Sequence, residues 1–108
     1  MAEHKGAKVV LVTCGNLAEA RKIARSVVEL ELAACVNIIS APVESVFRWK
    51  GRVERAKEFL LIIKTTRRRI ARLQEQIAAL HNYDVPEFLV LKVDGGSQPY
   101  LSWLAANA

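Results

Sequence analysis

The first third of the chain pairs an apolar run with a helical pattern. Residues 8–14 are almost continuously apolar, which predicts a strand that is buried on both faces. Gly15 ends this run, and Asn16 followed by Glu19 three residues later is typical of a capping box at the start of a helix. Over residues 17–32 the apolar positions recur at three- and four-residue spacing, which predicts an amphipathic helix. Its apolar face comprises Ala20, Ile23, Ala24, Val27 and Val28.

The middle third predicts a long β-hairpin. Residues 35–39 form a short apolar strand, Pro42 interrupts it, and the pattern resumes over residues 43–49. Lys50-Gly51 is a two-residue turn with glycine second, and the return strand follows over residues 52–65. Each arm exceeds the common length of about five or six residues, so its distal part should project beyond so small a domain. Because projecting strand edges need a partner, we expect an oligomer.

The last third predicts a helix, a strand and a terminal helix. Thr66 is placed to cap a helix over residues 67–80. Residues 88–93 form the last main strand, and residues 97–106 form a short helix with Pro99 in its first turn. The apolar stripe of the longer helix comprises Ile70, Leu73, Ile77 and Leu80. The order βαββαβ followed by a helix is that of the ferredoxin-like fold.

Length and composition fit one globular domain, since the chain has 108 residues, of which 52% are apolar. We therefore predict an α/β (α+β) class and a single domain over residues 1–108, built as a ferredoxin-like sandwich with a C-terminal helix. Residues 1–7, which include His4, are expected to form a mobile tail. A domain of this size holds one core but no deep catalytic cavity, so further concave surface would come from oligomerisation.

The net charge, the length of the apolar runs and the cysteine spacing limit the classes of partner and the compartment that we expect. The net charge of +5 would permit nucleic-acid binding, but no RNA-binding motif accompanies the basic run of residues 67–69 and Arg72, which also fits a solvated helix face. No apolar run approaches the roughly 20 residues of a membrane span, and no signal peptide is visible. Cys14 and Cys35 form no Cys-x-x-Cys motif and are expected to be reduced and buried. We expect a cytoplasmic protein with neither a membrane nor a nucleic-acid partner.

Candidate chemistry is sparse. No nucleophile–base pair, phosphate-binding loop or dinucleotide fingerprint is present, so we expect neither an enzyme nor an organic cofactor. His81, Asp84 and Glu87 place an imidazole and two carboxylates within seven residues, and these donors suit Cu, Zn or Ni. Alternatively, His81 meets the last carbonyls of the helix that precedes it. A thiolate from Cys14 near His81 would make a soft-metal site, although a cysteine at such a position is more often a small core residue.

A set of aromatic and charged residues is a second candidate site. Trp and Tyr are enriched at interfaces because they bury a large area and keep one polar group. Glu58 and Lys64 lie on the apolar half of a strand, where an unpaired charge is costly. Two interpretations stay open: a small-ligand or cation cleft between subunits, and a structural polar network at an oligomer interface. The set comprises Trp49, Glu58, Lys64, Tyr83, Tyr100 and Trp103.

Six segments, taken together, resemble the CutA family of divalent-cation tolerance proteins in order and spacing. They are residues 9–14, 32–39, 47–51, 61–65, 81–87 and 100–104. The resemblance covers nearly the whole chain. It implies a ferredoxin-like subunit in a tight homotrimer joined by strands across subunits. It also implies a role in tolerance of divalent cations, with copper bound in some members.

Carried over by position, the resemblance implies that His81 is a metal ligand and that Cys14 is a second ligand in some members. It also implies that Glu87 joins the aromatic and charged set in a cleft between subunits. The chain departs from the family at Asn82, where a proline is usual, and at Asp84, where a glutamate is common.

Three functions remain as hypotheses. The first is a trimeric cation-responsive protein that binds Cu(II) or another divalent cation at His81. The second is a sensor of a small anionic ligand, because the resemblance extends to the trimeric PII signalling proteins, which hold ligands between subunits. The third is an interaction module without a ligand, whose stable trimer docks partners. We take the first as the working hypothesis.

Overall fold

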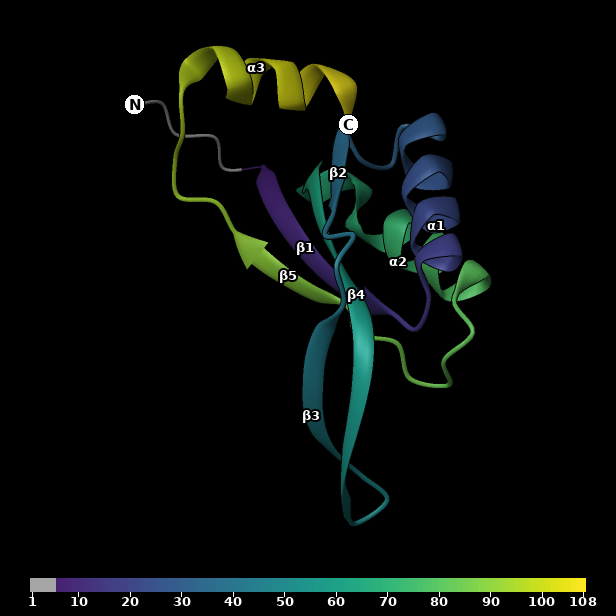
Figure 1. The fold of residues 1–108 in the computed structure, drawn as a ribbon. Helices are drawn as coiled ribbons and strands as arrows, with labels where there is room; N and C mark the ends of the chain where they lie inside the picture. Colours follow the sequence, from purple (N-terminus) through teal and green to yellow (C-terminus); the bar gives the residue numbers. More distant parts are fainter. Residues whose placement is uncertain (1–5) are drawn as a thin grey trace.

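An antiparallel five-stranded sheet with two helices on one face forms the body of the molecule (Figure 1). The computed structural model describes residues 6–108. The elements in chain order are β1 (Ala7–Cys14), α1 (Leu17–Glu29), β2 (Cys35–Ile38), β3 (Val43–Trp49), β4 (Arg52–Thr66), the 3-10 turn η1 (Arg67–Arg69), α2 (Ile70–Leu80), β5 (Leu89–Lys92) and α3 (Gln98–Asn107). The sheet order is β2-β4-β1-β5, and β3 pairs with β4 beyond the body. Because β2 and β3 are two parts of one interrupted strand, the predicted ferredoxin-like order is confirmed.

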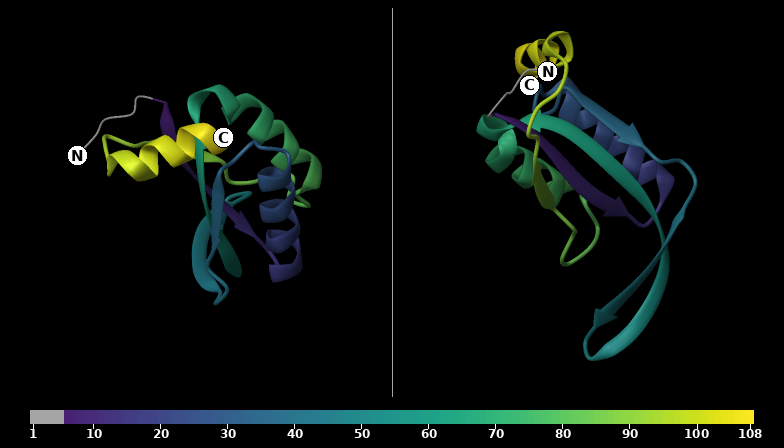
Figure 2. Two further views of the ribbon diagram at one scale, coloured as in Figure 1. Left: turned by 90° about the horizontal axis from the view of Figure 1, so that it is seen from above. Right: turned by 90° about the vertical axis from the view of Figure 1, so that its left-hand side faces the viewer.

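The core lies between the sheet and the helices α1 and α2, which share one face of the sheet (Figure 2). On β1 every second side chain points into this core, as the two-residue period of a strand requires. The fully buried side chains of this core include Val10, Val12, Ile23, Val27, Leu61, Ile63 and Leu73. A smaller apolar cluster beneath α3 covers the end of the sheet where β1 begins.

The second face of the sheet is only partly covered, which corrects the prediction that β1 is buried on both faces. Val9 and Leu11 are half-buried, and their β5 partners Leu91 and Leu89 are exposed. No described element other than α3, at one end, lies over this face (Figure 2). The continuous apolar run of β1 therefore has one face packed within the chain and one face that is open to a partner.

A projecting hairpin makes the molecule elongated, with extents of 44 × 25 × 25 Å (Figure 1). β3 and β4 pair from Val43↔Glu58 to Trp49↔Arg52, beyond the reach of the other strands. Lys50 and Gly51 take positive φ angles of 50° and 78°, as a type I′ turn requires, so the predicted turn is confirmed. Apolar side chains along this arm are exposed, among them Val46, Phe47, Trp49 and Val53.

Several local predictions need correction. α1 ends at Glu29 rather than at residue 32, because Glu31 turns into the left-handed region at φ 59° and terminates the helix. Thr66 precedes η1 with an extended backbone, but its side chain makes no capping bond. Ala7, assigned above to a mobile tail, is completely buried because it pairs with Thr66 and packs beneath α3. The rest of that tail up to residue 5, His4 included, lies outside the described residues.

None of the described helices is long and apolar enough to cross a membrane. Both cysteines are free, as predicted. They lie apart, since Cys14 pairs with Phe59 of β4 and Cys35 with Lys64. Cys14 is completely buried, whereas Cys35 is only half-buried.

Candidate functional site

Three unlike donor atoms converge at the edge of the sheet where β1 ends. The Cys14 sulfur, a Glu19 carboxylate oxygen and a His81 ring nitrogen all lie within 4.8 Å of one another. Within residues 6–108 this is the one group of three or more His, Cys, Asp or Glu side chains close enough to share an ion. We call these three residues the donor cluster.

The fold itself brings these residues to one edge. β1 ends at Cys14, α1 begins there, and α2 runs back along the sheet to end at the same edge with His81 (Figure 1). The helix start is fixed by Asn16, whose Oδ1 accepts the Glu19 N–H at 2.8 Å. This confirms half of the predicted capping box.

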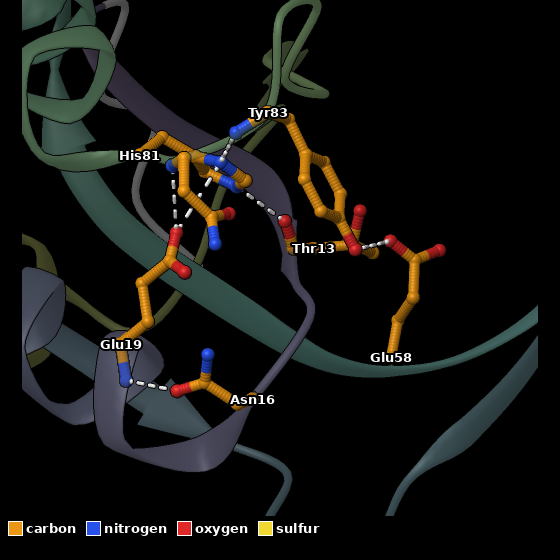
Figure 3. A network of polar contacts seen from close by, with 7 residues as sticks. Thr13, Asn16, Glu19, Glu58, His81 and Tyr83 are labelled. Carbon is orange, nitrogen blue, oxygen red and sulfur yellow. Dashed lines mark hydrogen bonds and ion pairs between the residues drawn. The ribbon is translucent and has the colours of Figure 1, made fainter.

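The Glu19 side chain does not complete the capping box. It reaches instead to the residues that follow α2, where Oε1 accepts the Asn82 N–H at 3.2 Å and lies 3.3 Å from Nδ1 of His81 (Figure 3). The side chain is 10% exposed, so this carboxylate is largely removed from water. A carboxylate held beside an imidazole in this way favours a cation between them.

Both ring nitrogens of His81 are engaged. Nε2 lies 2.7 Å from the Thr13 carbonyl oxygen, and because a carbonyl can only accept, Nε2 carries the proton. In the neutral ring Nδ1 is then an acceptor, and it receives the Tyr83 N–H at 3.1 Å (Figure 3). The backbone N–H of His81 donates to the Ile77 carbonyl at 2.8 Å, so the predicted helix-end role is confirmed for the main chain, whereas the ring bonds to β1 and to its own loop.

The Cys14 thiol is protonated at neutral pH. Burial, followed by the negative charges of Glu19 and Glu58, raises the pKa of Cys14 from 9.0 to about 12. A thiolate is needed to bind a metal ion, so an ion that uses Cys14 must displace its proton.

Tyr83 covers the donor cluster and ties it to β4. Its ring packs against the His81 ring with centroids 4.6 Å apart, and its hydroxyl donates to Glu58 Oε2 at 3.0 Å (Figure 3). A Cβ at Gly15 would stand 3.1 Å from the Tyr83 oxygen, so a side chain there would fit only if the Tyr83 ring moved by a few tenths of an ångström. Burial first, then the bond to Glu58, raises the pKa of Tyr83 to about 12, so the hydroxyl remains a donor.

The predicted trio of His81, Asp84 and Glu87 is not assembled. Asp84 is exposed, and Glu87 lies nearer to Glu58, whose charge adds to burial in raising the pKa of Glu87. The reason is that the two ring nitrogens of His81 are engaged by the Thr13 carbonyl and the Tyr83 N–H, and neither faces Asp84 or Glu87. Proximity in sequence within a loop does not fix a common direction for three side chains.

Comparison with known proteins decides the family. The sequence model described as CutA1 divalent ion tolerance protein matches residues 8–107. The chain belongs to the CutA1 family. The family is described by tolerance of divalent cations rather than by a reaction.

Three related proteins show how far the similarity extends. Protein CutA, chloroplastic, of Arabidopsis thaliana is 48% identical over 89% of this chain and 52% of its own length. The divalent-cation tolerance protein CutA of Thermus thermophilus is 44% identical over 93% of this chain and 96% of its own length. Its solved structure has a TM-score of 0.92 at 43% identity and covers 94% of this chain and 98% of that chain. This CutA1-family chain therefore spans about half of the Arabidopsis protein and nearly all of the Thermus protein.

A third relative was solved with a small molecule. CutA of Synechococcus elongatus PCC7942, complexed with a Bis-Tris molecule, has a TM-score of 0.89 at 34% identity. The match covers 99% of this chain and 98% of that chain.

The predicted cleft residues of this CutA1-family chain fall into three places. Glu58, Tyr83 and Glu87 lie beside the donor cluster. At the other end of the body, Lys64 Nζ lies 6.0 Å from the Tyr100 ring centroid, and the Tyr100 and Trp103 rings lie 5.5 Å apart. Trp49 stands at the tip of the hairpin. A single chain does not gather these residues, so a common cleft between subunits stays a prediction.

Glu19 is the member of the donor cluster that the sequence analysis missed. The capping pattern accounted for it with a local role, which left no reason to look further. A signal was present in the order of the elements: in a ferredoxin-like CutA1 subunit the end of β1, the start of α1 and the end of α2 share one edge. Acidic, thiol and imidazole groups at those three positions are therefore candidates for one site.

Proposed function

We propose that this protein binds one copper or zinc ion per subunit through Cys14, Glu19 and His81, and that this binding underlies a role in tolerance of divalent cations. The convergence of the three donor atoms within 4.8 Å carries the proposal. The family to which the chain belongs supports the same direction.

The donor chemistry fits such an ion. Sulfur, imidazole nitrogen and a single carboxylate suit Cu or Zn, whereas Mg²⁺ and Ca²⁺ prefer sites made of oxygen. The bond from Nε2 of His81 to the Thr13 carbonyl is the arrangement that orients a metal-binding imidazole and leaves Nδ1 for the ion. Three protein ligands leave a fourth position for water or another ligand. The free thiols suit a reducing compartment, in keeping with the expected cytoplasmic location.

Calorimetric titration of tag-free protein with Zn(II) and Cu(II) tests the proposal. We expect saturable binding at one ion per subunit, lost in His81→Ala and weakened in Glu19→Gln, which keeps the shape of the side chain and removes its charge. Asp84→Asn is the matched control, because Asp84 is an exposed carboxylate in the same loop. Binding that survives in His81→Ala, or an equal loss in Asp84→Asn, would contradict the assignment.

Trimeric assembly is part of the proposal. The half-buried second face of the sheet, the exposed β5 residues Leu89 and Leu91, and the aromatic tip of the hairpin support a second copy of the chain as the partner. Sedimentation should give about three times the subunit mass of 12.0 kDa at micromolar concentration. A clean monomer would refute this part alone.

A second candidate function is binding of a small anion beside Lys64. The half-exposed Tyr100 and Trp103 rings next to this ammonium group favour it. Trp49→Phe leaves Trp103 as the single tryptophan, so its fluorescence can be titrated with citrate and inorganic phosphate. A saturable change that is lost in Lys64→Gln supports this function, and no change rejects it for these anions.

A further inference from the structure

We infer that Tyr83 couples a cation in the donor cluster to the base of the projecting hairpin. The backbone N–H of Tyr83 bonds to the ring nitrogen that the cation needs, and its hydroxyl bonds to Glu58 of β4. The inference rests on the proposed function, since it concerns how that same site acts on the rest of the molecule.

The first step is a competition for one atom of His81. Nε2 is protonated and donates to the Thr13 carbonyl, which leaves Nδ1 as the nitrogen available to an ion. A neutral imidazole nitrogen has a single lone pair in the ring plane, and on Nδ1 the Tyr83 N–H occupies it at 3.1 Å. A cation on Nδ1 and this hydrogen bond therefore exclude each other, and cation binding displaces the backbone at Tyr83.

The second step is the transfer of that displacement to the Tyr83 hydroxyl. The ring is confined between the His81 ring, at 4.6 Å between centroids, and Gly15, where no Cβ would fit without a shift. A tyrosine side chain has only two rotatable bonds with which to compensate for a moved backbone. The Asn82 N–H is held by Glu19, whereas Asp84 on the other side is exposed and leaves the Tyr83 backbone room to move, so that the bond from the hydroxyl to Glu58 changes with it.

The third step places Glu58 at a joint of the fold. β4 pairs with β1 as far as Phe59, opposite Cys14, and its next residue toward the hairpin tip is Glu58, opposite Val43 of β3. Glu58 is 8% exposed, so its carboxylate depends on the Tyr83 hydroxyl for a partner. Loss of this bond loosens the point at which the hairpin leaves the body. The arm that carries the exposed Phe47 and Trp49 then becomes more mobile as well.

Hydrogen exchange measured by mass spectrometry, with and without Zn(II), tests the coupling. Tyr83→Phe removes the hydroxyl and keeps the ring and the backbone N–H. Tyr100→Phe is the matched control. Tyr100 is the only other tyrosine of the sequence, and it lies beside Trp103 and Lys64, away from the donor cluster. In the wild type we expect zinc to raise exchange about tenfold at residues 54–59, relative to residues 9–12 of β1. In Tyr83→Phe exchange at the hairpin base should be high already and should not respond to zinc.

Calorimetric zinc titration of the same samples distinguishes a failure of this inference from a failure of the proposed function. The inference is supported if zinc binds the wild type, Tyr83→Phe and Tyr100→Phe with equal stoichiometry, and if exchange at the hairpin base responds to zinc in the wild type and Tyr100→Phe but not in Tyr83→Phe. Equal binding with no hairpin response in the wild type, or with the same response in Tyr83→Phe, overturns the inference and leaves the proposed function standing. No saturable binding by the wild type overturns both.

Discussion

The affinity for zinc should rise steeply with pH because of Cys14. Burial and the charges of Glu19 and Glu58 raise the pKa of this thiol from 9.0 to about 12, so it is protonated throughout the range from pH 6.5 to 8.5. Each bound ion then releases one proton from the thiol. The apparent association constant should increase about tenfold per pH unit from this group alone, without levelling off.

The same pKa shift determines how much binding free energy is lost in deprotonating Cys14. Deprotonating a thiol of pKa about 12 rather than 9.0 takes about 4 kcal/mol of the binding free energy, or roughly a thousandfold in affinity. The negative charge of Glu19 opposes the thiolate in the free protein, and under the proposal the same carboxylate becomes a ligand once the ion binds. The donor cluster should therefore bind zinc more weakly than a site with the same three ligands and an exposed cysteine.

The assay is competition with a chromophoric zinc chelator at steps of about half a pH unit. The Cys14→Ala variant supplies the control, since it shares every other titratable group with the wild type. The slope of log affinity against pH should be larger in the wild type than in the variant by about one log unit per pH unit. Equal slopes would show that Cys14 is not a ligand, and a wild-type slope that flattens near pH 8 would refute the raised thiol pKa.

Three further predictions concern the neighbourhood of Tyr83 and the hairpin. Because the pKa values of Cys14 and Tyr83 are raised in the fold, both groups contribute stability that is present below about pH 9 and is lost as pH rises toward about 12. The urea midpoint should therefore fall between pH 8 and pH 10.5, and it should fall less in Tyr83→Phe than in the wild type. Gly15→Ala should cost about 1 to 2 kcal/mol by pressing on the Tyr83 ring, and the same change in a Tyr83→Ala background should be close to neutral if the clash is the cause. Trp49→Ala should weaken self-association by about 2 kcal/mol or more in sedimentation equilibrium, and an unchanged equilibrium would mean that Trp49 is an ordinary surface residue.

Elements and turns were predictable because their causes are local. The helical spacing of α1, the side chain of Asn16 and the glycine of the Lys50-Gly51 turn each act within a few residues, and the structure has them as expected. The open second face of the sheet was not predictable in the same way. An apolar run such as β1 predicts that both faces are covered, but it does not say whether the same chain or a partner supplies the cover.

The donor cluster was only partly predictable because its members are assembled by tertiary structure. His81 and Cys14 were identified as candidate ligands, and the structure brings them together, although metal binding itself stays a proposal. Asp84 and Glu87 were grouped with His81 through proximity in sequence, whereas the ring points toward β1. Glu19 had a sufficient local explanation, and only the packing of α1 beside the end of α2 gives its carboxylate a different partner.

The hairpin also has a consequence for the order of folding. Its strands are adjacent in sequence and joined by a type I′ turn, so they can pair outward from Lys50-Gly51 within microseconds. The β1–β4 ladder joins residues from Cys14↔Phe59 to Ala7↔Thr66, and such non-local pairing is slow because a long loop must close first. The donor cluster needs β1, α1 and the end of α2 in place together. We therefore expect the arm to form early in folding and the donor cluster late. The proposed ion would then bind a folded subunit and would not template its folding.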